Sequence, residues 1–250
     1  MFLRLNKYSY SYTFFIYYDN MQKIKMLVCD FDGTLVKSHH SFPSTLTIKL
    51  LKNISKKNVR LVLSSGRSYD YLSGFSRALG LDTIIISGDG SSINYKDKKI
   101  NLVKKRKMPN PLRKKIIERF PELNTSYWSH RDGIRVDIEK LTKKKKIQVT
   151  RFIKSTARSI NYKGHIISYP ELLDIGHQYS NKGIALKMLM KLINVKKHEV
   201  IAIGDYKNDI PMIKKVGLFI FIGNKTKHRQ KHIKRFDTIE QALSYINTIC

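Results

Sequence analysis

Short apolar runs that alternate with helix-patterned segments constrain the fold of this chain most strongly. Apolar residues dominate 26–30, 59–65 and 82–87, and each run ends at a polar side chain. Segments 43–58 and 66–80 lie between these runs and carry apolar residues at helical spacing. Continuous apolar runs are typical of strands buried on both faces. The alternation therefore predicts a parallel sheet with helical crossovers.

The pattern changes between residues 88 and 178 and then returns. In this stretch strand-like pieces alternate with two predicted helices, 110–120 and 143–160. Beyond residue 181 the strand and helix alternation resumes, with predicted helices at 182–193, 209–216 and 238–249 and predicted strands at 199–204 and 218–223. We therefore predict an α/β core formed by 24–87 and 179–250, with a smaller α+β domain inserted at 88–178 and an N-terminal extension at 1–23.

Composition supports a globular protein in a reducing setting. The chain has 250 residues and a hydrophobic fraction of 42%, which is enough to bury a core. Two cysteines, Cys29 and Cys250, cannot form a disulfide framework, and we expect a cytoplasmic location. The stretch 1–23 is too short and too polar to span a membrane, and it has no small-residue cleavage site. We expect a mis-assigned start or a loosely attached extension there, and no membrane partner.

The formal charge of +29 is the main feature of the composition. Such a charge is consistent with nucleic-acid binding, with attraction of small anionic substrates, or with lysines that are merely solvated. The basic residues are spread along the chain and form no combined aromatic and basic recognition signature. We therefore favour solvated lysines and expect no nucleic-acid partner.

Four short motifs stand where predicted strands end or helices begin. They are Asp30 to Thr34, Ser65 to Arg67, Lys182-Gly183 and Gly204 to Asp209. Ligands bind at the carboxyl ends of the strands in open α/β sheets. Two carboxylates about 4 Å apart repel by about 4 kcal/mol at an effective dielectric near 20, so the first motif needs a nearby cation or a chemical role. An Asp-Gly turn after a strand is the alternative interpretation.

Together, the four ordered motifs resemble those of the haloacid dehalogenase-like hydrolase superfamily. The resemblance extends from about Ile24 over nearly the whole chain. An α+β cap inserted between the second and third motifs is similar to that of the Cof and sucrose-phosphate-phosphatase subgroup, which includes archaeal phosphoglycolate phosphatases. The resemblance implies a Rossmann-like core and a Mg²⁺-dependent phosphatase. Its substrate would be a small phosphorylated metabolite, phosphoglycolate or a sugar phosphate, and the protein would be a monomer or homodimer.

By the same resemblance, the acidic residues have distinct roles. Asp30 would be the nucleophile that forms an aspartyl-phosphate, and Asp32 would be the general acid and base. Mg²⁺ would be held by Asp30, the backbone carbonyl of Asp32, Asp205 and Asp209.

The remaining motif residues would bind the phosphoryl group. Thr34, the Ser65 hydroxyl, the Gly66 amide and Asn208 are expected to lie at the phosphate site, and Asn208 would orient Asp209 or a water molecule there. Lys182 would pair with the phosphate and with Asp30. Alone, Lys182 is more simply a solvated lysine, and Ser65 a helix N-cap.

Two stretches depart from the family pattern. Tyr206 and Lys207 follow the Gly-Asp of the fourth motif, where the family often has a small residue. Asp89-Gly90-Ser91 replaces the Asn-Gly-Ala that is frequent near the cap entry. The second departure makes substrate contacts by that loop uncertain and leaves the expected chemistry unchanged.

Two alternative functions stay open at this point. One is a phosphomutase of the same superfamily, which the absence of a second phosphate-handling motif disfavours. The other is a basic nucleic-acid-binding protein that retains a hydrolase fold, which the four intact motifs disfavour.

Overall fold

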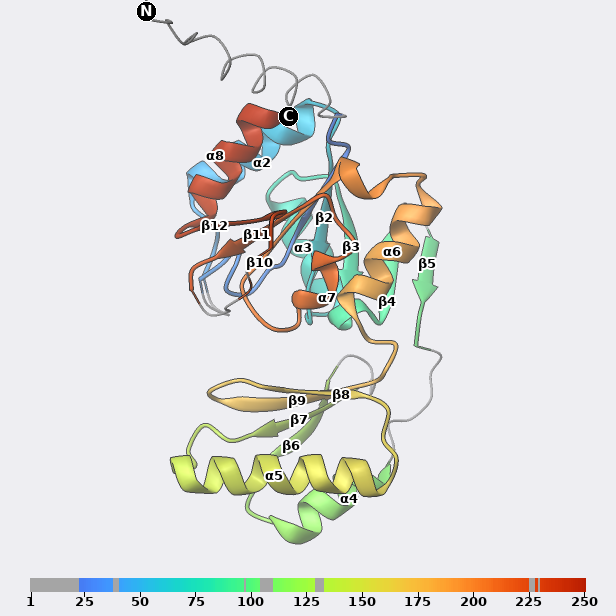
Figure 1. Ribbon diagram of the computed structural model, residues 1–250, viewed down its shortest axis with the longest axis vertical. Coiled ribbons are helices and arrows are strands. Elements are labelled where there is room, and N and C mark those ends of the chain that lie inside the picture. The colour runs from blue at the N-terminus through green and yellow to red at the C-terminus, as the bar shows by residue number, and fades with distance from the viewer. Residues whose placement is uncertain are drawn as a thin grey trace, which may run out of the picture.

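The computed structural model describes residues 23–37, 41–96, 98–103, 110–128, 133–224, 228 and 230–250. Two sheets organise these residues (Figure 1). The larger has eight strands in the order β12-β11-β10-β1-β2-β3-β4-β5. Its strands are β1 (Met26–Cys29), β2 (Arg60–Ser64), β3 (Thr83–Ser87), β4 (Ser92–Tyr95), β5 (Lys98–Asn101), β10 (Val200–Gly204), β11 (Leu218–Ile222) and β12 (Ile233–Phe236).

Most neighbours in this sheet are parallel, and only the pairings β3–β4 and β4–β5 are antiparallel, so β4 alone runs in the opposite direction among the described strands of this sheet. Helices cover both faces, as the continuous apolar runs predict. One face packs against α2, α3 and α8, and the other against α6 and α7. Their bounds are α2 (Thr45–Lys56), α3 (Tyr69–Ala78), α6 (Lys182–Leu192), α7 (Ile210–Ile213) and α8 (Ile239–Ile249). The predicted α/β class with a mostly parallel sheet is confirmed.

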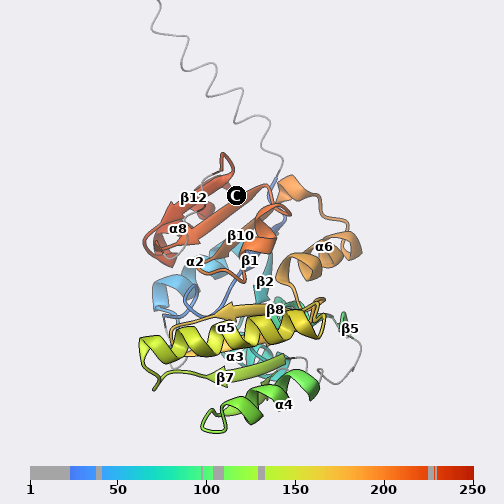
Figure 2. The same cartoon turned by 60° about the horizontal axis from the view of Figure 1, so that its bottom comes forward.

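The second sheet is antiparallel, has four strands in the order β6-β7-β9-β8, and carries two helices on one face. It comprises β6 (Thr125–Trp128), β7 (Gly133–Asp137), β8 (His165–Ser168), β9 (Leu172–Gly176), α4 (Asn110–Arg119) and α5 (Lys143–Ser159). We call these elements the cap. Its sheet lies between its own helices and the larger sheet, so the face without helices is directed at the core (Figures 1 and 2).

The sequence predicts that the inserted domain starts at residue 88, but the next two strands pair with the larger sheet. Strand β4 pairs antiparallel with β3, and β5 pairs with β4, so both strands extend the larger sheet. The segment 98–101, which the sequence pattern assigned to the insertion, therefore belongs to the core sheet. The sequence of a strand this short does not specify which of the two sheets the strand joins.

The sequence pattern did not predict strands β4, β6 and β12. Strand β12 lies in a basic stretch, its residues are partly buried or exposed, and among the described strands it pairs only with β11. Edge strands have a weaker apolar pattern than central strands because only one side is paired.

The predicted N-terminal extension, apart from Lys23, lies outside the described residues. Among the helices that the structure describes, none is long and apolar enough to cross a membrane.

Candidate active site

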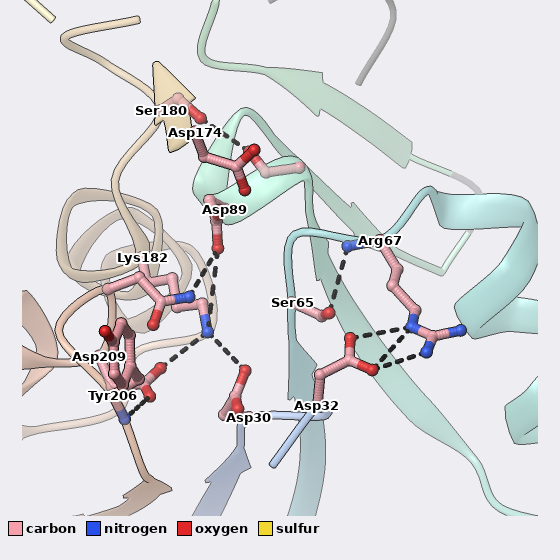
Figure 3. Close-up of polar contacts among 12 residues, drawn as sticks. Asp30, Asp32, Ser65, Arg67, Asp89, Asp174, Ser180, Lys182, Tyr206 and Asp209 are labelled. Carbon is pink, nitrogen blue, oxygen red and sulfur yellow. Dashed lines mark hydrogen bonds and ion pairs between the residues drawn. The ribbon is translucent and has the colours of Figure 1, made fainter. Parts of the chain in front are cut away.

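Polar residues from four neighbouring strands meet at the carboxyl edge of the larger sheet (Figure 3). Asp30 follows β1, Ser65 follows β2, Asp89 follows β3 and Asp205 follows β10. Parallel strands place these ends side by side, because each pairs with its neighbour in register. The residues that the motifs singled out are therefore neighbours in space.

A buried ammonium lies at the centre of this group. The Nζ atom of Lys182 lies 2.5 Å from Asp30 Oδ1 and 2.7 Å from Asp209 Oδ1. A third carboxylate oxygen, Asp89 Oδ1, lies 3.9 Å away. Lys182 is the first residue of α6, whose N-cap Asn181 accepts a hydrogen bond from the Ile184 amide. Since a helix N-terminus disfavours a cation, the carboxylates account for the location of this lysine.

Burial and mutual repulsion perturb the acids around Lys182. Burial, followed by the negative charge of Asp209, raises the pKa of Asp30 well above its ordinary value. Burial also raises the pKa of Asp209, although the Lys182 ammonium acts in the opposite direction. For Lys182 itself burial acts to lower the pKa, but Asp209, Asp30 and Asp89 outweigh this effect and raise it. The lysine is charged, and the carboxylates around it are only partly compensated.

Backbone amides and a tight turn position the other two acids of this group. The Asp209 Oδ2 atom accepts hydrogen bonds from the amides of Asp205 and Tyr206, both at 3.1 Å. Thr34 donates its hydroxyl to Asp205 Oδ1 at 3.3 Å. Gly33 adopts φ +83°, and a Cβ there would lie 2.4 Å from Asp205 Oδ2. A glycine is therefore required both for the turn and for the close approach of Asp205.

Three of these acids could hold a metal ion. One carboxylate oxygen from each of Asp30, Asp205 and Asp209 lies within 4.8 Å of the others, and all three residues are buried. Hard divalent ions such as Mg²⁺ take carboxylate oxygens as ligands. A cation here would offset the negative charge that Lys182 leaves uncompensated, so the donor set is suited to Mg²⁺. Asp32, predicted to take part through its backbone carbonyl, contributes no side-chain oxygen to this cluster.

The Asp32 side chain instead pairs with a different cation, on the other side of Asp30 (Figure 3). Arg67 donates from Nη2 to Asp32 Oδ1 at 2.6 Å and from Nε to Oδ2 at 2.8 Å. This pairing with Asp32 raises the pKa of the Arg67 guanidinium.

Ser65 lies between the two cations in Figure 3, and Gly66 follows it in the chain. Ser65 is buried, and its Oγ atom accepts a hydrogen bond from the Arg67 amide at 3.2 Å, which leaves the hydroxyl proton able to donate. A Cβ at Gly66 would lie 3.2 Å from Asp89 Oδ2, closer than most Cβ contacts, so Asp89 would have to shift slightly. The loop after β2 is thus closely packed against the loop after β3.

The sequence prediction missed the location of Asp89. This residue is buried at φ 50°, in the left-handed region, and it accepts a hydrogen bond from Asn208 Nδ2 at 3.1 Å. Asn208 therefore orients Asp89. The available signal was an Asp-Gly pair directly after an apolar run, which is the same pattern as in the first motif.

The departure at Tyr206 and Lys207 is explained by a contact with the cap. Tyr206 donates its hydroxyl to the Ser168 carbonyl at 2.9 Å, and its ring stacks on Tyr169 with centroids 4.9 Å apart. Lys207 is exposed, and its Nζ atom lies 5.9 Å from the centre of the Tyr206 ring. The first of these residues joins the core to the cap, and the second is directed outward.

A second cap element faces the same region. Asp174 of β9 lies near Asp89 in Figure 3 and is buried. Arg135 of β7 donates from Nε and Nη2 to the two Asp174 oxygens at 2.9 and 3.0 Å. The cap therefore contributes a paired carboxylate and guanidinium to the surroundings of the site.

The chain is similar to known hydrolases in family, in sequence and in structure. The family model described as haloacid dehalogenase-like hydrolase matches residues 27–165 and 134–238. Phosphoglycolate phosphatase 1 of Saccharolobus solfataricus is 26% identical over 203 residues, which cover 80% of this chain and 83% of the relative. The 5-amino-6-(5-phospho-D-ribitylamino)uracil phosphatase YcsE of Bacillus subtilis is 24% identical over 229 residues, covering 80% of this chain and 84% of that protein.

Solved structures share the fold. The sucrose-phosphatase of Synechocystis sp. PCC6803, in complex with sucrose and phosphate, superposes with a TM-score of 0.69 at 18% identity. The match covers 91% of this chain and 98% of that one.

Proposed function

The chain belongs to the haloacid dehalogenase-like hydrolases, in their Cof and sucrose-phosphatase-like subclass, and from this premise we propose that it hydrolyses a small phosphomonoester through a phosphoaspartyl intermediate on Asp30. The family and the relatives make the protein a phosphatase. The observation that carries the finer proposal is the buried Lys182 ammonium, 2.5 Å from Asp30 and 2.7 Å from Asp209, at the carboxyl edge of the sheet.

In the first step, a carboxylate oxygen of Asp30 attacks phosphorus. An Asp30–phosphorus bond forms while the bond from phosphorus to the ester oxygen breaks. Asp32 gives its proton to the departing oxygen, so the alcohol leaves neutral.

In the second step, water attacks phosphorus and the bond to Asp30 breaks. Asp32, now ionised, takes a proton from that water molecule, which releases inorganic phosphate and restores the Asp30 carboxylate and the protonated Asp32. Arg67 donates hydrogen bonds to both Asp32 oxygens and so fixes their orientation. This supports the assignment, because the Asp32 carboxyl group gives a proton in the first step and takes one in the second.

Three residues would stabilise the transferring phosphoryl group. Ser65 lies on one side of Asp30 in Figure 3, and its hydroxyl and the amide of the adjacent Gly66 would donate to phosphoryl oxygens. Lys182 lies on the other side and compensates the charge on Asp30 and on the phosphoryl group. Thr34, predicted to contact the phosphoryl group, donates its hydroxyl to Asp205 Oδ1 and would also orient that carboxylate at the metal site.

Asp30, Asp205 and Asp209 would hold Mg²⁺, with the Asp32 backbone carbonyl as a further oxygen donor. When bound, the ion supplies positive charge that neutralises phosphoryl oxygens and lets an anionic nucleophile approach them.

The cap supports a small substrate. Its free sheet face is directed at the site, and Tyr206 ties it to the core through Ser168 (Figure 1). Phosphoglycolate and sugar phosphates are the first candidates, because relatives with these specificities cover most of the chain. The YcsE relative adds a phosphorylated pyrimidine to the candidates.

A phosphate-release screen tests the proposal. Wild-type protein and Asp30→Asn are assayed with Mg²⁺ or with EDTA, against phosphoglycolate, a sugar-phosphate panel, a phosphopeptide and a 5′-phosphorylated oligonucleotide. We expect Mg²⁺-dependent turnover of at least one small phosphomonoester and higher kcat/KM for it than for either macromolecule. An active, folded Asp30→Asn variant, or preference for the macromolecules, would contradict the proposal.

A further inference from the structure

The pair formed by Arg67 and Asp32 is held more rigidly than an ordinary surface ion pair. Besides the bonds at 2.6 and 2.8 Å, Nε lies 3.1 Å from Asp32 Oδ1, so both carboxylate oxygens face the fork of the guanidinium. The side chains are 16% and 25% exposed, so the pair is only partly accessible to water. Bidentate pairing fixes the plane of the carboxylate as well as its distance.

Two aromatic rings restrict the guanidinium from its other side. Its Cζ atom lies 4.1 Å from the centre of the Tyr71 ring and 5.0 Å from that of Phe31. Phe31 is fully buried and lies edge-on to both Tyr71 and Phe75. Arg67 therefore packs against one core ring, Phe31, and one exposed ring, Tyr71, and this packing limits its rotamers.

The backbone of Arg67 is also held in place. Its amide donates to Ser65 Oγ at 3.2 Å, and its carbonyl accepts from the Gly88 amide at 3.1 Å. A single residue thus connects the loops after β2 and β3 with the acidic side chain that follows β1. The Asp32 carboxylate is directed away from Lys182 and toward Ser65 and α3 (Figure 3).

We propose that Arg67 is the positioning residue for the acid and base carboxylate Asp32, and that it holds the carboxylate on the leaving-group side of the phosphoryl site, opposite Lys182. The inference rests on the proposed function, because it assigns a partner to the proton-transfer group of that reaction. Arg67 contributes no atom to bond making or breaking. The bidentate bonds of its guanidinium, together with the Tyr71 and Phe31 rings, hold the Asp32 oxygens in one place. There they would face the departing ester oxygen in the first step and the attacking water in the second.

The rate of the first step should depend on the orientation of Asp32 for an alkyl phosphate but not for p-nitrophenyl phosphate. The rate of the second step should depend on it for both esters. An alkyl ester oxygen is a poor leaving group and needs the proton from Asp32, whereas p-nitrophenolate leaves without one. Attack of water on the phosphoaspartyl group needs the Asp32 carboxylate in both cases. A displaced Asp32 therefore slows both steps for an alkyl phosphate but only the second step for p-nitrophenyl phosphate.

The test compares wild type, Arg67→Gln, Arg67→Lys and the control Arg77→Gln, an exposed arginine in the last turn of α3, the helix that follows Arg67. We expect Arg67→Gln to lower kcat for an alkyl phosphate by about 10–100-fold, below the full loss of about 10²–10⁴ for a missing general acid and base, with KM changed by less than about threefold. With p-nitrophenyl phosphate, rapid mixing should show a burst of nearly one p-nitrophenolate per active site and then slow turnover. Arg67→Lys keeps the positive charge but cannot form the bidentate pair, so its kcat should lie between those of Arg67→Gln and wild type.

Equal losses for both esters without a burst, or kinetics like those of the control, would overturn the inference. If Arg67→Gln fails to fold, Tyr71→Leu carries the test, because it removes the stack and keeps the ion pair; it should show the same burst with a smaller loss of kcat. Failure of the proposed function is recognised separately, by wild-type protein that releases no phosphate or by an active Asp30→Asn variant.

Discussion

The two carboxylates of the first motif are two residues apart and lie in opposite electrostatic surroundings. Asp30 shares one ammonium, Lys182, with Asp209, and neither the lysine nor Asp209 has an exposed side chain. Asp32 has a guanidinium of its own, in a pair that is 16% and 25% exposed. One half of the site has an excess of buried negative charge, and the other half is balanced one to one.

This difference indicates what each half contributes. Buried charges without full compensation are costly, so the half around Lys182 should control stability and metal affinity. A partly exposed, balanced pair contributes little to stability, so the half around Arg67 should control geometry. The following five predictions test this division, from the largest expected effect to the smallest.

Asp30→Asn should abolish turnover while the fold persists. Loss of the nucleophile is expected to lower kcat by about 10⁴-fold or more. The melting temperature should stay the same or rise, because the amide removes one of the mutually repelling acids. Steady-state kinetics and thermal unfolding check both parts, with the exposed Asp70→Asn as control. Activity close to that of the control would show that Asp30 is not the nucleophile.

Lys182→Met should be the most destabilising change in the site. It leaves Asp30 and Asp209 buried without their cation, which costs about 3–5 kcal/mol in the free energy of unfolding. Urea denaturation at neutral pH measures this loss, and millimolar Mg²⁺ should restore part of it. A loss below that of Arg67→Gln would contradict the comparison.

Mg²⁺ should stabilise the wild-type protein more at pH 7.5 than at pH 5. The pKa of Asp30 and of Asp209 is raised in the folded protein, so in the absence of metal their contribution favours folding at low pH and is lost as pH rises through the folded pKa values. A bound ion removes this loss, and a concentration of about 100 Kd adds about 2.7 kcal/mol. Melting temperatures with Mg²⁺ or EDTA at the two pH values give the difference, and an equal shift at both would refute the assignment.

Gly33→Ala should weaken metal binding selectively. The new Cβ would lie 2.4 Å from Asp205 Oδ2, so that carboxylate must move. We expect the Mg²⁺ concentration for half-maximal activity to rise about 10–100-fold, the range for disturbed metal-site support. Gly74→Ala, where a Cβ meets nothing within 4 Å, is the matched control. An unchanged Mg²⁺ requirement would exclude Asp205 as a ligand.

Arg67→Gln should change stability least. A partly exposed ion pair is worth about 1 kcal/mol or less, so the urea midpoint should move only slightly while kcat falls. The same urea titration as for Lys182→Met gives a direct comparison of the two cations. A destabilisation as large as that of Lys182→Met would mean that the two halves do not differ as described.

Local pattern was sufficient for much of the fold and for the choice of site residues. An apolar run followed by an acid or a hydroxyl identifies a buried strand and its end, so Asp30, Ser65 and Asp205 could be predicted to share one edge of a parallel sheet. The role of Lys182 could be predicted only from the resemblance to a family, because nothing near it in the sequence distinguishes it from the other lysines. The structure brings it to Asp30 across 152 residues.

Only the tertiary structure decided which partner each polar side chain has and which sheet the ambiguous strands join. The direction of Asp32 depends on Arg67, 35 residues away, and the role of Asn208 depends on Asp89, 119 residues away. Strands β4 and β5 join the core sheet because β3 offers them an edge, which their own sequences do not encode. The strand periodicity is a property of neighbouring residues, whereas an ion pair or a sheet edge exists only after distant segments have packed together.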